Sequence, residues 1–343
     1  NIIKIFSNTY VGMYQPIPTI TYAIEYKFFN NNPSVYHTTN IFLHLINILL
    51  VFWLLLLWTG GNRLAAAIAT SLFALHPMNV ETVAWLSTRS NLILTMFSLL
   101  SLISYLKYIK SGYRKTYYIL TLFCFILALF SKSQSIILPL LFILFDYYFH
   151  RTGKSKFWEK LPFFLLSIIF GIITLYTRKP EGDYTTFNFQ EIFEKILYVC
   201  YAIFWYLCKF FVPYNSSPIY YYPEKINNSL PVVYYITPFI LAVLVFFIIR
   251  YRKKIKDLIY ALLFFILSIS ITLPFFILGS YFVADRYAYL PYVGLFWFTG
   301  IKISALIKKY DSLKEKLKKT FLFIFIFCVL ICFSYLTYNR NLI

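Results

Sequence analysis

A short polar segment between two strongly apolar runs carries the side chains best suited to chemistry in this chain. It reads LHPMNVETVAWLSTRSN, from Leu75 to Asn91, and it includes His76, Glu81 and Arg89. At the edge of a membrane, a carboxylate is suited to proton transfer, and a guanidinium is suited to binding a phosphate. We therefore treat this segment as the candidate wall of a functional site.

The spacing within this segment predicts a helix that begins near Pro77. Proline is favoured in the first turn of a helix, where its missing N–H costs nothing. Glu81, Trp85 and Arg89 follow at intervals of four and would share one face of that helix. The alternative is a short interfacial helix in which Trp85 is an aromatic anchor and the charges pair or face lipid headgroups.

Further polar residues lie at the ends of other apolar runs. The candidate substrate-binding residues, besides His76 and Arg89, are His37, Asn91, Lys132, Gln134, Asp285, Arg286 and Tyr287. His37 and His44 bracket Asn40 in YHTTNIFLH, and this helical spacing favours interhelical hydrogen bonds over metal binding. Lys132 either extends to the headgroups or belongs to the site.

The composition is typical of a polytopic membrane protein. Hydrophobic residues make up 60% of the chain and charged residues 13%, against roughly 45 to 50% and 25% in soluble domains. The net charge of +19 comes from clusters between apolar runs, which indicate topology and contact with anionic lipid rather than nucleic-acid binding. The five cysteines lie in apolar runs without a CxxC motif, so neither disulfides nor a metal centre are indicated.

The apolar runs predict one all-α domain, residues 1–343, with about ten transmembrane helices. The expected spans are Val35–Trp58, Leu64–Leu75, Asn91–Tyr108, Tyr117–Phe130, Ile136–Phe149, Leu161–Thr177, Val232–Ile249, Leu258–Leu278, Tyr289–Ile303 and Phe321–Tyr338. Before them, Asn1–Asn32 is expected to form the end of a loop and an interfacial helix, because Gln15-Pro16-Ile17-Pro18 would break any helix. The basic run Lys302–Lys319 is expected to form an amphipathic surface helix.

The basic clusters predict an orientation, because Lys and Arg favour the cytoplasmic side. Between the clusters near Lys160 and Arg250 the chain must then cross an even number of times, although three apolar stretches lie there. We expect Ile192–Val212 not to cross, because it contains Lys209 and a charge at mid-bilayer costs about 2.5–3.5 kcal/mol. This stretch would be re-entrant or lie on the outer face, and the candidate site residues would gather at the extracytoplasmic side.

The polar segment resembles a motif of a known family. LFALHPMNVETVAWLSTRSNLI is similar to the HP-x-x-x-E-x-VAW-x-x-x-R-x-D-L segment of GT-C type membrane glycosyltransferases. The likeness is to the protein O-mannosyltransferase-like group, whose animal members carry lumenal tetratricopeptide repeats, and to its bacterial relatives. Four further stretches resemble motifs of that group in the same order: YQPIPTITYAIEY, NPSVYHTTNIFLHLINILL, SKSQSIILPLLFILFDYYF and ADRYAYLPYVG.

The resemblance implies transfer of a sugar from a polyprenyl-phosphate carrier to a protein or glycan acceptor on the extracytoplasmic or lumenal face. The lipid-linked donor is the only cofactor expected, and a divalent metal is not indicated. Arg89, Lys132 and Arg286 are the cations suited to the lipid phosphate. Glu81 is the candidate base, or it orients Arg89 or His76.

The same resemblance places the main catalytic acid in the first extracytoplasmic loop. Asn1 to Tyr14 contains no Asp or Glu, so we expect that acid upstream of Asn1 or absent. Asn91 and Gln134 also stand where the group usually has Asp and Glu, and Asp285 is expected to fix a neighbouring side chain.

Two other classes of function therefore stay open. One is a catalytically silent membrane subunit that binds a partner protein. The other is a lipid or glycan transporter, which would predict paired broken helices in internal repeats, and the sequence shows none. As the location we expect the bacterial inner membrane rather than the endoplasmic reticulum, where the sequons at Asn215 and Asn227 would matter.

Overall fold

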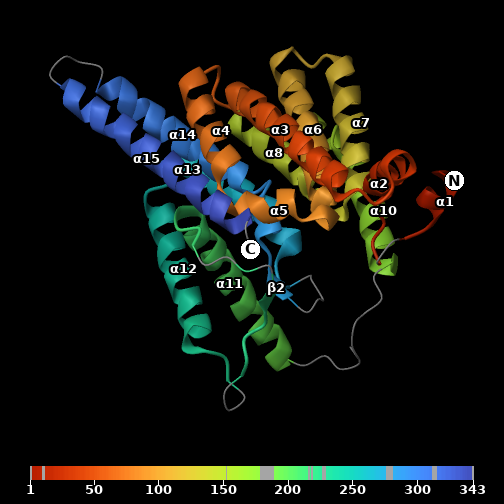
Figure 1. The fold of residues 1–343 in the computed structure, drawn as a ribbon. Helices are drawn as coiled ribbons and strands as arrows, with labels where there is room; N and C mark the ends of the chain where they lie inside the picture. The colour runs from red at the N-terminus through yellow and green to blue at the C-terminus, as the bar shows by residue number, and fades with distance from the viewer. Residues whose placement is uncertain are drawn as a thin grey trace.

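The structure is a computed structural model that describes residues 2–9, 12–151, 153–177, 189–214, 217, 219–225, 229–275, 281–310 and 315–341. These residues are almost entirely helical (Figure 1). The α-helices are α1 (Ile2–Ser7), α2 (Pro16–Phe29), α3 (Pro33–Trp58), α4 (Arg63–Leu75), α5 (Val80–Ala84), α6 (Arg89–Lys110), α7 (Lys115–Ser131), α8 (Leu138–Tyr148), α9 (Lys154–Trp158), α10 (Leu161–Thr177), α11 (Phe189–Phe211), α12 (Val232–Arg250), α13 (Lys256–Ile269), α14 (Tyr292–Lys309) and α15 (Lys316–Asn341).

Short 3-10 helices and one pair of strands complete the described structure. The 3-10 helices are η1 (Pro77–Asn79), η2 (Leu86–Thr88), η3 (Ser133–Ile137), η4 (Ser270–Thr272) and η5 (Asp285–Ala288). Strands β1 (Tyr220–Tyr221) and β2 (Tyr281–Val283) pair antiparallel and are the one departure from the all-α prediction in the described part of the chain. The sequons at Asn215 and Asn227 lie outside the described residues.

The prediction of a multi-pass membrane protein is confirmed. Among the described residues, five helical segments are long and apolar enough to cross a membrane: Pro33–Trp58, Leu86–Lys110, Lys156–Thr177, Val232–Arg250 and Lys316–Asn341. Three shorter apolar helical segments are Arg63–Leu75, Lys115–Ser131 and Ser133–Tyr148. The expected total of about ten transmembrane helices stays a prediction, since it depends on the short helices crossing as well.

The expected surface helix in the basic run Lys302–Lys319 is wrong. Helix α14 continues to Lys309 because Ile307 is still buried against the bundle. The next basic residues open α15 at Lys316, so the run ends one helix and begins another, and residues 311–314 lie outside the description. Lysines in the last turn of α14 also suit the negative end of its helix dipole.

The apolar stretch that we expected not to cross forms α11, which packs along α12 (Figure 1). Tyr198, Ala202, Tyr206 and Phe210 recur every fourth residue and are buried, so the helix has one packed stripe. Helix α11 is not among the five long apolar segments. Whether it crosses the membrane stays a prediction.

Two basic residues of the cluster assigned to the cytoplasm are buried rather than exposed to headgroups. Lys160 and Arg151 both pair with Asp146, and the Tyr105 hydroxyl donates to the same carboxylate at 2.7 Å. A buried ion pair is part of the packed structure and says little about which side of the membrane it faces. The orientation therefore depends on the other clusters.

Close packing of α14 on α4 brings the polar segment to η5. A Cβ atom added to Gly300 of α14 would lie 2.3 Å from the Ala65 carbonyl oxygen of α4, so the two backbones touch there. At the other end of the pair, α4 leads into His76 and α14 follows η5. Two segments more than 200 residues apart in sequence meet at this end, where Glu81 contacts Arg286.

Candidate functional site

The polar segment is broken into short pieces, so the continuous helix from Pro77 is wrong. Helix α5 ends at Ala84, and Trp85 has an extended backbone with φ −78° and ψ 116°. The Thr88 hydroxyl lies 3.1 Å from the carbonyl oxygen of Glu81 and 2.6 Å from that of Trp85. Such side-chain hydrogen bonds compete with a regular helix, and here they support a tight bend.

The break separates Glu81 from Arg89 and turns Glu81 towards η5. One carboxylate oxygen, Oε1, pairs with Nη1 of Arg286, and the other, Oε2, accepts from the Arg286 backbone N–H at 2.9 Å. The partner of Glu81 is therefore Arg286, so the alternative in which Glu81 orients Arg89 or His76 does not apply. Both oxygens of this buried carboxylate are occupied, which favours an orienting role over that of a base.

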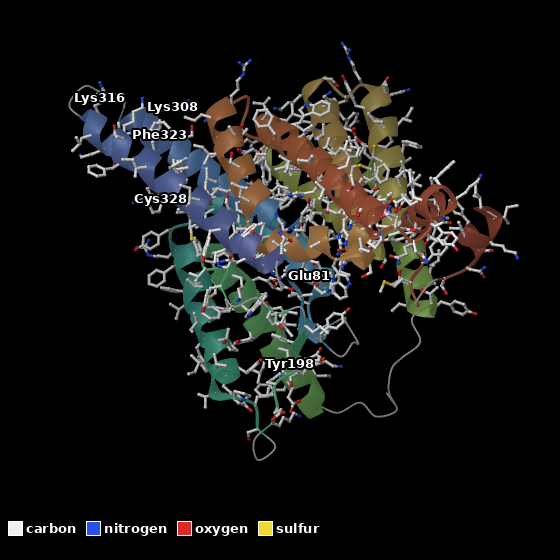
Figure 2. The ribbon with its side chains drawn as sticks, in the orientation of Figure 1. Glu81, Tyr198, Lys308, Lys316, Phe323 and Cys328 are labelled. Carbon is white, nitrogen blue, oxygen red and sulfur yellow. The ribbon has the colours of Figure 1, made fainter. Side chains whose placement is uncertain are left out.

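The Arg286 guanidinium lies among aromatic rings. Its Cζ atom is 5.2 Å from the ring centre of Trp85 and 5.0 Å from those of Tyr281 and Tyr287. Cation–π contacts of this kind help to hold a guanidinium in one orientation. Figure 2 shows Glu81 at the centre of the molecule, between the main bundle and the pair α11 and α12. The side chain of Arg286 keeps 10% of its surface exposed.

A small cavity joins Arg286 to other predicted site residues. It is lined by Asn91, Leu94, Thr95, Ser98, Gln134, Ser135, Ile137, Leu138, Ser268, Thr272, Arg286, Tyr287, Tyr289, Leu290 and Pro291. Lys132 does not line the cavity itself. Its ammonium donates to Oδ1 of Asn91, a lining residue, at 2.6 Å. The structure thus brings together Asn91, Lys132, Gln134, Arg286 and Tyr287.

The cavity is polar and narrow. Asn91 Nδ2, Ser98 Oγ and Ser268 Oγ have no hydrogen-bond partner within the described part of the chain. The volume is about 20 Å³, which is room for a water molecule, whereas a sugar ring needs far more. Unpaired buried polar groups are costly, so these three groups indicate bound water or the hydroxyl of a ligand.

Arg89 lies in a separate, closed cluster. Its side chain is fully buried and donates to Glu25 Oε2 at 2.5 Å, Asn40 Oδ1 at 2.9 Å and the Tyr36 carbonyl oxygen at 3.0 Å. The Tyr22 ring centre lies 4.3 Å from Cζ. Arg89 therefore binds α2 and α3 to the start of α6, and it does not line the cavity.

Sequence reasoning did not single out Glu25, the carboxylate that neutralises Arg89. It is 7% exposed and lies in the stretch YAIEY of α2, which also carries the arginine's Tyr22 contact. A glutamate among apolar residues in the middle of α2 was the available signal, because a buried carboxylate needs a cation.

His76 is a packed residue at the end of α4. Its Nδ1 accepts from the Met78 N–H at 3.3 Å, and its Nε2–H donates to the Phe210 carbonyl oxygen at 3.2 Å. Burial lowers the pKa of His76 to about 4, so the ring is neutral at pH 7. Both nitrogens are engaged, and the ring does not line the cavity.

Asp285 fixes a neighbour, but that neighbour is Arg340 of α15 rather than Arg286 beside it in sequence. The Asp285 carboxylate is fully buried and pairs with Nη2 of Arg340. Burial raises the pKa of Asp285 to about 6; Arg340 opposes this rise, and the nearby Glu81 charge adds to it.

The two histidines of α3 differ in burial: His44 is partly buried and His37 is exposed. His44 accepts from the Tyr289 hydroxyl at 2.6 Å, and Asn40 Nδ2 donates to the Val83 carbonyl oxygen at 3.1 Å, which confirms the interhelical hydrogen bonds. His37 is exposed and does not line the cavity. Among the described residues, no group of three or more His, Cys, Asp or Glu side chains is placed to hold a metal ion.

Comparisons with known proteins find relatives in the group that the sequence resembles. A protein O-mannosyl-transferase of Caenorhabditis elegans is 24% identical over 320 residues, which cover 88% of this chain and 44% of the relative. Protein O-mannosyl-transferase TMTC4 of Mus musculus is 34% identical over 163 residues, 42% of this chain and 22% of the relative, and its Homo sapiens counterpart is 31% identical over 162 residues, with the same coverage. The resemblance to protein O-mannosyltransferases is confirmed, and the chain spans less than half the length of these relatives. No family model and no solved structure matches the chain.

Proposed function

We propose that this chain forms the membrane part of a glycosyltransferase that moves a sugar from a polyprenyl-phosphate carrier to a protein or glycan hydroxyl on the extracytoplasmic or lumenal face. The names of the relatives favour mannose as the sugar and a protein as the acceptor. The proposal is carried by one observation: Glu81 and aromatic rings fix the Arg286 guanidinium beside a polar cavity.

Departure of the sugar leaves negative charge on the lipid phosphate, so fixed positive charge nearby lowers the barrier. A guanidinium carries five N–H donors in a rigid fork, and the Glu81 side chain takes one of them. Lys132 adds a second cation behind Asn91, as a point charge on a flexible stem. We assign Arg286 to direct phosphate contact and Lys132 to a supporting role.

The lipid tail needs an apolar path away from the phosphate. A pocket of about 220 Å³ lies between α11 and the segment after α13, lined by Ile196, Val199, Cys200, Ser270, Leu273 and Phe275. Thr272, which lines the polar cavity, directly precedes Leu273 of this apolar pocket. A polar cavity and an apolar pocket thus follow each other along the chain, which is the arrangement that a carrier with a charged head and a hydrocarbon tail requires; the 20 Å³ cavity would have to widen to admit the head.

The acceptor hydroxyl needs a base, and the described residues around the cavity offer no free carboxylate. The cavity lining contains no Asp or Glu among the described residues, and Glu81 and Asp285 are both paired with arginines. We therefore propose that the base lies outside the described residues of the cavity lining, and that Glu81 holds Arg286.

The same pairing favours a second candidate, a silent membrane subunit that binds a partner membrane protein. The two are separated by assaying the full-length protein in lipid nanodiscs with polyprenyl-phosphate mannose and acceptor peptides. If the protein is an enzyme, the wild type consumes the donor. The double variant Glu81→Gln/Arg286→Gln should reduce donor consumption by roughly 100-fold. The control Arg63→Ala, at an exposed arginine, should consume donor at the wild-type rate.

The outcome of this assay also defines the role of Glu81. If Glu81→Gln alone eliminates turnover with donor still bound, Glu81 is the base after all. If the wild-type protein consumes no donor with any acceptor, the enzyme proposal fails and the silent-subunit hypothesis replaces it.

A further inference from the structure

Two buried carboxylates lie close together at this site, and each has its own arginine. Glu81 pairs with Arg286 of η5, and Asp285 pairs with Arg340 of α15. The side chains of Glu81 and Asp285 are 4% and 0% exposed, so water screens neither charge well. Because Asp285 and Arg286 are consecutive, the two ion pairs share one short stretch of backbone.

Arg340 reaches this stretch from a helix that is otherwise hardly packed. Helix α15 runs from Lys316, at the edge of the molecule, towards the centre near Glu81 (Figure 2). Phe333 is its one buried residue among those described. Over the last turns, Thr337 Oγ1 donates to the Leu75 carbonyl oxygen at 2.9 Å and Arg340 Nη1 to that of Pro77 at 2.8 Å.

We propose that Arg340 is a positioning residue for the donor phosphate: by neutralising Asp285 it leaves Arg286 committed to Glu81 and oriented at the cavity. This inference rests on the proposed role of Arg286. Arg340 itself does not line the cavity, so it acts through the pair Asp285 and Arg286.

The physical reason is the number of charges. With Arg340 present, each of the two carboxylates has one guanidinium group as its ion-pair partner, and the Lys209 ammonium of α11 adds a favourable charge near Asp285. Without Arg340, the Glu81 and Asp285 carboxylates repel each other across a poorly screened interior, and both compete for Arg286. A guanidinium drawn towards Asp285 would present its donors to the phosphate in the wrong direction.

The experiment measures donor KM and kcat for the full-length protein in nanodiscs with polyprenyl-phosphate mannose. Arg340→Gln keeps a donor for the Pro77 carbonyl but removes the charge, and we expect donor KM to rise roughly tenfold or more with a smaller change in kcat. Adding Asp285→Asn to Arg340→Gln should return KM to within about threefold of wild type, because the uncompensated charge is gone.

Two controls separate positioning from simple anchoring of α15. Thr337→Val removes the other hydrogen bond of the same helix end, and Arg250→Ala removes an exposed arginine from the end of α12; neither should raise donor KM. If Arg340→Gln does not fold, the proposal requires Asp285→Asn to restore folding as well as KM.

The inference is overturned if Asp285→Asn fails to rescue Arg340→Gln, or if Thr337→Val has the same effect. Failure of the proposed function looks different. In that case the wild-type protein consumes no donor with any acceptor, so there is no donor KM to compare. If only the role of Arg286 fails, turnover is present and Arg286→Lys leaves donor KM unchanged.

Discussion

Arg89 and Arg286 were both expected to bind the lipid phosphate, but the structure places Arg89 in a closed cluster and Arg286 beside a cavity. The region around Arg89 is closed: its guanidinium is fully buried, with Glu25, Asn40 and a backbone carbonyl as partners. The region around Arg286 lies at a cavity with unpaired polar atoms, where Glu81 fixes one side of the guanidinium.

The difference shows how the same side chain serves stability in one place and binding in another. The Arg89 guanidinium donates through Nε, Nη1 and Nη2 to protein acceptors, so it holds helices together and does not face the cavity. A guanidinium fixed by one carboxylate beside a polar cavity is prepared for a second anion. The following predictions test this distinction, beginning with the largest effect.

Removing Arg89 should unfold the protein rather than impair the site alone. Arg89→Ala leaves Glu25 as an unpaired buried charge, and we expect a loss of about 3–5 kcal/mol in the free energy of unfolding. Reversible unfolding by detergent titration measures this loss, with the exposed Arg63→Ala as the control. A loss no larger than that of Arg63→Ala would contradict the closed cluster.

Replacing each ion pair by neutral amides should separate the two regions by function. Glu25→Gln/Arg89→Gln removes both charges together, so any protein that folds should keep transfer activity within about threefold. Glu81→Gln/Arg286→Gln should lower transfer by roughly 100-fold, because the fixed positive charge for the phosphate is lost. Equal losses of activity in the two double variants would contradict the assignment of Arg89 to stability and Arg286 to phosphate binding.

Lys132 should have a smaller effect than Arg286, because it stands behind Asn91. Lys132→Met keeps most of the apolar stem, and we expect donor KM to rise roughly tenfold with little loss of stability. Lys27→Met, at an exposed lysine of α2, is the matched control. An unchanged donor KM in Lys132→Met would show that Lys132 does not contribute to donor binding and extends to the lipid headgroups instead.

The smallest predicted effect concerns His76. Like Arg89, it is buried and its side-chain nitrogens are hydrogen-bonded to other protein groups. Its pKa is lowered from 6.5 to about 4, so the folded state holds the neutral ring. Its contribution to stability is present above pH 6.5 and is lost as the pH falls towards 4, by about 1 kcal/mol between pH 6.5 and 5.5.

Because the raised pKa of Asp285 has the opposite sign, the useful quantity is the difference between wild type and His76→Gln. The unfolding free energy of each protein at pH 6.5 and pH 5.5 gives it. Identical pH dependence in the two proteins would show that His76 is not held neutral by burial.

Much of the helical framework could be predicted from the sequence. The expected span Leu161–Thr177 has the same bounds as α10, because a long apolar run follows a basic cluster and needs no distant partner to form a helix. The polar segment could not be predicted in this way. Its bend depends on the Thr88 hydroxyl and on Glu81 reaching η5, and both override the helical spacing.

The candidate site was predicted as a set of residues but not as a set of contacts. Hydropathy places Arg89 and Arg286 at the ends of apolar runs, yet it carries no information on which carboxylate each will meet. Glu25 lies 64 residues from Arg89, and Glu81 lies 205 residues from Arg286, so these pairs depend on how whole helices pack. Arg340 was missed for the same reason, since its partner Asp285 comes from a separate element.

The central claim is that Arg286 binds the phosphate of the lipid carrier. The most direct test is equilibrium binding of polyprenyl phosphate, without a sugar, to the full-length protein in nanodiscs, comparing wild type, Arg286→Lys and Arg63→Ala. We predict that Arg286→Lys weakens binding by roughly tenfold or more, because lysine cannot reproduce the bidentate contact, while Arg63→Ala binds as wild type does. Wild-type affinity in both variants would contradict the account.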